Sequence, residues 1–307
     1  MIALTLANKI LQLFLMMFCG WLLVKTGLLK SSDSKVLSIL CVYIIIPCTV
    51  INAFQISYTP EAAGNFLLAV ISAVSIHILL FLIVWGIGKV YPLSRIEKAS
   101  LIYSNAGNLI IPLVTAVLGE DYVLYASAFM IVQLFIIWTH GRSLIEGKSG
   151  ADFKAILTNV NLIACVLGLV MFLCRITLPS FLQETMKGIG SMIGPAAMIM
   201  IGMILAGSDI VSMIREKRIW IISFMKMILI PAAVILIMKL SGFASLSPEG
   251  STILYISLMA CMTPSAATVT QMAQLYDQDA GYATAINTIT TLMCIATMPL
   301  LTMLYYL

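Results

Sequence analysis

Long apolar runs, separated by short polar segments, fill almost the whole chain. Each run is close to the ~20 residues that an α-helix needs to cross a bilayer. A transmembrane barrel would instead alternate apolar and polar positions within segments of about ten residues, and no such alternation appears. The pattern predicts an all-α polytopic membrane protein with ten spans, at roughly 5–25, 35–56, 63–89, 96–118, 121–143, 154–175, 184–207, 218–240, 250–275 and 281–306.

The composition agrees with this class. Hydrophobic residues make up 61% of the chain and charged residues 10%, with a mean hydropathy of +1.07, which excludes an ordinary soluble domain. The net charge of +4 comes from short loops and does not predict nucleic-acid binding. The seven cysteines lie in or beside apolar runs and show no CxxC pair or metal-ligand spacing, so we expect no metal and no cofactor.

The Lys/Arg bias of the loops predicts the orientation in the cell membrane. Basic residues follow spans one, three, five and seven, whereas the alternate loops are poor in them. The loops after odd-numbered spans are therefore expected to be cytoplasmic, which places both termini outside the cytoplasm.

An internal repeat divides the chain into residues 1–150 and 151–307, each with five spans. Pro47 matches Pro195 and Pro112 matches Pro264, in both cases about 150 residues apart and in equivalent spans. Because five is odd, the second half has inverted topology. Inverted repeats with interrupted helices are typical of secondary transporters, whose binding sites lie where the broken helices meet.

Two proline-containing breaks mark the centre of spans four and nine. The candidate substrate-binding residues lie there: Asn105, Asn108, Pro112, Thr263, Pro264 and Ser265. We expect Thr263 to cap a half-helix and Pro264 to occupy its first turn. Two half-helix N-termini that converge would favour an anion. The alternative is a simple kink, with these polar groups bonding neighbouring helices.

Four other polar residues lie in the middle of spans and form a candidate support or coupling site. His77 in span three and Lys226 in span eight are repeat-related, and ionisable groups inside a membrane are functional candidates. Alternatively, His77 is a neutral histidine bonded to a helix carbonyl, and Lys226 snorkels to the cytoplasmic end of its span. Gln133 in span five and Asn287 in span ten are expected to support the crossing of the broken spans.

These motifs resemble those of the auxin efflux carrier family of permeases. The resemblance rests on Ser104-Asn105-Ala106-Gly107 with Ile111-Pro112-Leu113, on Thr263-Pro264-Ser265 with Ala273-Gln274-Leu275-Tyr276, on Gly194-Pro195-Ala196-Ala197 with Gly202, and on Met298-Pro299-Leu300-Leu301. It covers essentially all ten spans. The loop after span five, about 144–155, is much shorter than in plant carriers, which indicates a prokaryotic-type permease.

The resemblance implies a 5+5 inverted repeat in which spans four and nine cross. Spans one, two, six and seven would form a scaffold with the contact of a homodimer, and spans three to five and eight to ten a mobile transport domain. It also implies that Asn105 binds substrate and that Gln133 belongs to a support site. His77 stands where the family is expected to have an acidic residue, which leaves the coupling ion, H⁺ or Na⁺, open.

The sequence therefore predicts a secondary transporter, not an enzyme, that moves small organic anions such as carboxylates by elevator-like alternating access. One alternative is a Na⁺- or proton-coupled carrier or antiporter on the same fold. Another is a membrane receptor that binds an anion without transporting it.

Overall fold

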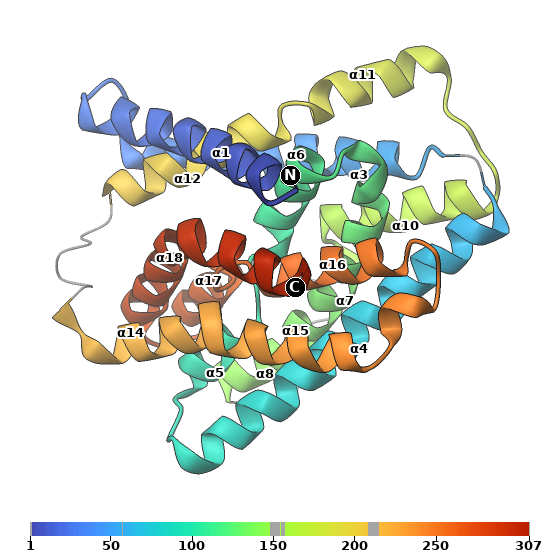
Figure 1. Cartoon of the computed structure of the whole chain (residues 1–307). Helices are drawn as coiled ribbons and strands as arrows, with labels where there is room; N and C mark the ends of the chain where they lie inside the picture. Colours follow the sequence, from blue (N-terminus) through green and yellow to red (C-terminus); the bar gives the residue numbers. More distant parts are fainter. Residues whose placement is uncertain (1, 57, 148–153, 155–156, 208–214, 307) are drawn as a thin grey trace. The chain divides into compact units, whose positions relative to one another are not determined.

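The computed structural model describes residues 2–56, 58–147, 154, 157–207 and 215–306, and these form helices and connecting turns (Figure 1). The predicted boundary between the repeats, after residue 150, lies outside this part of the chain. The α-helices are α1 (Ile2–Lys25), α2 (Ser34–Leu40), α3 (Ile46–Ala53), α4 (Pro60–Val90), α5 (Arg95–Ile102), α6 (Ile111–Val117), α7 (Val123–Ile136), α8 (Arg142–Glu146), α10 (Val160–Leu173), α11 (Ser180–Gly190), α12 (Ile193–Gly207), α14 (Lys217–Phe224), α15 (Ile230–Leu240), α16 (Gly250–Cys261), α17 (Ala267–Leu275) and α18 (Ala280–Tyr306).

Helical segments occupy all ten predicted spans, and the prediction of an all-α polytopic membrane protein is confirmed. Among the described residues, five continuous helices are long and apolar enough to cross a membrane, or six if the bent pair Ala280–Cys294 and Ala296–Tyr306 is one span. Spans four and nine do not meet this length test because each is broken at its centre. The first of them consists of α5 and α6, and the second of α16 and α17.

In the described part of the chain, four π-helical segments interrupt the spans: η2 (Cys41–Ile45), η3 (Ala106–Ile110), η5 (Ile137–Gly141) and η6 (Met225–Leu229). Three of them, η2, η3 and η6, are followed directly by an Ile-Pro pair. A proline lacks the N–H of a regular turn and clashes with the carbonyl four residues earlier. In η2 and η6 the residue before the proline bonds the carbonyl five residues back, so the wider turn accommodates the ring.

The chain folds into two compact units, which we describe separately. The first contains Met1–Phe66, Gly107–Ser127 and Leu157–Ser208. Its principal contact joins α1 and α12. A Cβ atom at Gly20 would collide with the backbone of Ile199, and one at Gly202 with the backbone of Met17. The two glycines thus allow the close backbone approach that holds many membrane helix pairs together.

The second unit contains Leu67–Ala106, Ala128–Ile156 and Asp209–Leu307. Helix α18 contacts α5, α14, α15 and α17 within it. The Glu97 carboxylate is fully buried and accepts hydrogen bonds from Arg218 Nη2 and the Tyr282 hydroxyl, both at 2.8 Å. One carboxylate therefore links α5, α14 and α18 at the end of α5 that is expected to face the cytoplasm.

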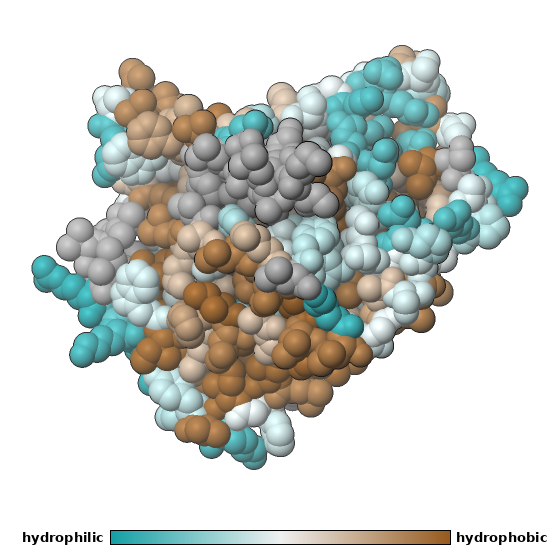
Figure 2. Space-filling model, viewed as in Figure 1, coloured by the Kyte–Doolittle hydropathy of each residue, from teal (hydrophilic) through white to brown (hydrophobic). Residues whose placement is uncertain are grey.

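Apolar side chains gather over α15 on the face shown in Figure 2. Leu229, Leu236 and Leu240 are among the large hydrophobic residues that this part of the chain leaves exposed. A soluble protein rarely exposes a continuous apolar surface. Such a face is expected of a helix that contacts lipid.

Candidate functional site

The two broken spans meet in the second unit through a short antiparallel pairing of extended backbone. Ser104 and Ser265 form an isolated bridge. The Asn105 N–H donates to the Pro264 carbonyl at 2.8 Å, and the Ala266 N–H donates to the Tyr103 carbonyl at 3.0 Å. A helix break inside a membrane leaves backbone groups that lipid cannot solvate. The pairing satisfies two donors and two acceptors of the breaks at once.

Gln133, on α7, holds the first break. Its Oε1 accepts the Ser104 N–H at 3.1 Å, and its Nε2 donates to the Ser104 carbonyl at 2.7 Å. Both backbone groups of a single residue are thus bound by one side-chain amide. Gln133 is buried, so water does not compete for these bonds.

Asn287 and Thr290, on α18, hold the second break in the equivalent way. Asn287 Nδ2 donates to the Ser265 carbonyl at 2.5 Å, and the Ser265 N–H donates to Thr290 Oγ1 at 3.2 Å. Each broken span is therefore fastened by polar side chains of the span that follows it in the sequence.

Lys226 lies on η6 with only 1% of its surface exposed. Its Nζ donates to Ser104 Oγ at 2.8 Å and to the Leu101 carbonyl at 3.2 Å, and Ser104 Oγ donates to the Cys261 carbonyl at 3.2 Å. The alternative that Lys226 snorkels to the end of its span is wrong. No carboxylate of the described residues forms an ion pair with Lys226.

His77, on α4, is also buried. Its Nδ1 lies 2.7 Å from the Ala73 carbonyl, and its ring centroid lies 4.8 Å from that of Phe129. This hydrogen bond to a carbonyl of its own helix is the arrangement expected of a packing histidine. Its other ring nitrogen, Nε2, is buried without a hydrogen-bond partner among the described residues.

Two polar side chains at the crossing are not engaged within the described residues. Ser265 Oγ is buried without a hydrogen-bond partner. The backbone of Asn105 is fixed by Pro264, but its half-buried side-chain amide forms no hydrogen bond with the described part of the chain. A buried polar group without a partner is costly. Both side chains therefore have unused hydrogen-bonding capacity at the crossing.

The expected capping role of Thr263 is wrong. Its Oγ1 donates to the Ala260 carbonyl at 2.8 Å and so belongs to the end of α16. Helix α17 begins at Ala267, with Ala266 as its N-cap residue and no side-chain cap. The extended pairing occupies residues 264–266, and this moves the start of the half-helix beyond Pro264.

The structure brings eight of the ten predicted site residues into the second unit: Asn105, Thr263, Pro264, Ser265, His77, Gln133, Lys226 and Asn287. Asn108 and Pro112 belong to the first unit. Pro112 lies in the first turn of α6, and the side chain of Asn108 lies outside the described residues.

Sequence reasoning did not assign roles to Ser104 and Thr290. Ser104 is the residue on which Gln133 and Lys226 both converge, and Thr290 holds the second break. The available signal was the repeat itself, because Ser104 and Ser265 lie at corresponding places in the two breaks.

These features define an integral membrane protein whose two interrupted helices pair inside a bundle, the architecture of a transporter. A protein-family model described as membrane transport protein matches the chain twice, over residues 5–156 and 152–302. The chain belongs to this family of transporters, and the resemblance to auxin efflux carriers is confirmed. The two matches agree with the internal repeat. No curated protein matches the chain.

Proposed function

We propose that this membrane transport protein is a secondary transporter for small organic anions such as carboxylates, with its substrate site at the crossing. The observation that carries the proposal is the buried Lys226. Its ammonium group donates to two neutral oxygens, and none of the described carboxylates compensates its charge.

An isolated charge within a membrane protein is expensive, and such groups mark substrate or ion pathways. An anionic substrate near Lys226 would supply the missing negative charge. The unengaged amide of Asn105 and hydroxyl of Ser265 would then donate hydrogen bonds to a carboxylate without adding a second buried charge.

The two compact units support an elevator-like mechanism. The second unit contains the crossing and most of the spans expected to move, whereas the first contains the spans expected to form a scaffold and a homodimer contact. Two differences are that the start of span three, up to Phe66, and residues 107–127, from spans four and five, group with the first unit. The proposed location is the cell membrane, with both termini outside the cytoplasm.

The test is uptake of labelled mono- and dicarboxylates into liposomes that contain the purified protein, with and without H⁺ and Na⁺ gradients. Lys226→Met is compared with Lys239→Met, which removes an exposed lysine of the same span. We expect at least one carboxylate to be transported, Lys226→Met to reduce its uptake about 10-fold or more, and Lys239→Met to have no effect.

Full carboxylate uptake by a monodisperse Lys226→Met protein would overturn the role of the buried charge. Saturable binding without uptake under any gradient would indicate the receptor alternative. Dependence of uptake on the H⁺ or Na⁺ gradient would identify the coupling ion.

A further inference from the structure

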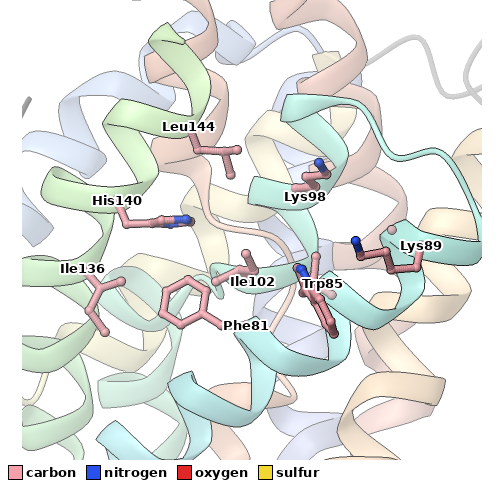
Figure 3. Close-up of a pocket in the computed structure, with 10 residues that line it drawn as sticks. Phe81, Trp85, Lys89, Lys98, Ile102, Ile136, His140 and Leu144 are labelled. Carbon is pink, nitrogen blue, oxygen red and sulfur yellow. The ribbon is translucent and has the colours of Figure 1, made fainter. Parts of the chain in front are cut away.

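A cavity of about 680 Å³ lies within the second unit (Figure 3). Helices α4, α5 and α8 and the segments around η5 supply its walls. The residues that line it are Phe81, Val84, Trp85, Gly88, Lys89, Lys98, Ile102, Ile136, His140 and Leu144.

The cavity has a basic rim. Figure 3 shows the amino groups of Lys89 and Lys98 on one side and the imidazole of His140 on the other. His140 Nδ1 lies 2.7 Å from the Tyr103 hydroxyl, so the positive charge of the rim comes from the two lysines. Among the described residues that line it there is no carboxylate. The acidic residues of α5 and α8 are already engaged, since Glu97 is bound by Arg218 and Glu146 by Arg142. The charge of the rim therefore favours an anion.

Packing places both lysines at this rim. Lys89 Nζ lies 5.0 Å from the ring centroid of Trp85, within the range of a cation–π contact. Lys98 passes over Gly88, where an added Cβ atom would lie 3.9 Å from Lys98 Cε. That spacing is an ordinary van der Waals contact, so the lysine stem packs along α4 beside the cavity.

The interior of the cavity is apolar. Phe81, Val84, Ile102, Ile136 and Leu144 supply aliphatic and aromatic surface.

The helix that carries both Lys89 and the cavity wall also exposes Leu82 and Trp85 by 59% and 66%. Tryptophan and lysine near the end of an apolar span are typical of the membrane–water interface. The Lys/Arg bias places this end of α4 at the cytoplasmic leaflet.

We propose that the cavity binds an anionic phospholipid, with its phosphate between Lys89 and Lys98 and part of an acyl chain against the apolar wall. Basic pockets between membrane helices on the cytoplasmic side suit such headgroups. A small hydrophilic anion would leave the apolar wall uncovered, whereas a zwitterionic lipid would carry a positive group toward the lysines.

Trp85 provides a local readout of this site. The test uses a variant in which Trp21, Trp138 and Trp220 are replaced by Phe, so that all tryptophan fluorescence comes from Trp85. Quenching of this fluorescence is measured in bilayers that contain either brominated phosphatidylglycerol or brominated phosphatidylcholine. We expect the anionic lipid to quench Trp85 with an apparent association constant larger by a factor on the order of 10. The double variant Lys89→Gln/Lys98→Gln should remove this preference.

Lys217→Gln is the matched control, because it removes an exposed cytoplasmic lysine of the same unit that does not line the cavity. Equal quenching by the two lipids, or equal effects of the cavity and control variants, would overturn the proposal. Relief of quenching by millimolar inorganic phosphate or a labelled carboxylate would also overturn it, because the site would then accept a soluble anion. Each variant is first required to be monodisperse.

Discussion

At the scale of single residues, the backbone and the side chain of Asn105 have different roles. Its backbone N–H bonds Pro264 and so stabilises the crossing, whereas its side-chain amide forms no hydrogen bond with the described part of the chain. We expect Asn105→Ala to preserve the fold and to weaken carboxylate binding about 10- to 100-fold, because a hydrogen bond to a charged group contributes about 1.5–3 kcal/mol. Equilibrium binding of the transported carboxylate measures this.

Asn52→Ala, which truncates a half-buried amide in the first unit, is the control. Wild-type affinity in a folded Asn105→Ala protein would remove Asn105 from the site.

Gln133 is expected to matter chiefly for stability. Gln133→Leu leaves the N–H and the carbonyl of Ser104 without their partners, and each buried unsatisfied group costs about 1–3 kcal/mol. The thermal unfolding midpoint in detergent should therefore fall by several degrees. Gln271→Leu, at an exposed position on α17, should leave it nearly unchanged. If both variants unfold at the wild-type temperature, Gln133 does not hold the break.

The sequence indicated some of these side chains and not others for a physical reason. An amide or an ionisable group in mid-span is rare, so Gln133, Asn287, His77 and Lys226 stand out. Serine and threonine in helices commonly bond a carbonyl of their own helix, as Thr290 does with Ile286 at 2.8 Å. Only the tertiary pairing shows that Thr290 also holds Ser265.

At the scale of elements, the π-helical segment η6 positions Lys226. Pro231→Ala removes the proline ring that disfavours a regular α-helix at this place. If the π-helical turn became α-helical, Lys226 would rotate about the helix axis by about 100° relative to α15. We expect carboxylate uptake to fall while the protein still inserts and folds.

Pro248→Ala, in the exposed turn before α16, is the control and should transport normally. Unchanged uptake by Pro231→Ala would mean that the π-helical segment persists without the proline.

The sequence predicted where the spans break more accurately than how they break. Proline and paired polar residues mark positions 104–112 and 262–265. The π-helical turns differ from α-helix by one residue per hydrogen-bonded ring, and hydrophobic periodicity does not resolve that difference. The start of α17 was misplaced because the pairing with residues 103–105 is a long-range contact.

At the scale of the whole molecule, the expected orientation can be tested at Tyr58, in the short connection before α4. In a protein whose seven native cysteines have been replaced, Tyr58→Cys should react with a membrane-impermeant maleimide in intact cells. Thr26→Cys, in the basic connection after α1, should react only after permeabilisation. The reverse pattern would invert the topology.

The division into two compact units follows from contacts that span the repeats, and so it does not follow the repeat boundary. Spans that are distant in sequence, such as those containing α1 and α12, pack together within one unit. The assignment of these units to a scaffold and a moving domain stays a prediction.

The uncompensated ammonium of Lys226 has an electrical consequence. In the proposed cycle, the empty carrier would move one positive charge through part of the transmembrane field, where each elementary charge is worth about 2.3 kcal/mol per ~100 mV. A bound monoanion would cancel that charge and make the loaded step nearly insensitive to voltage. A dianion would reverse its sign. The dependence of transport current on voltage would then report the valence of the substrate and distinguish the return of the empty carrier from the step that carries cargo.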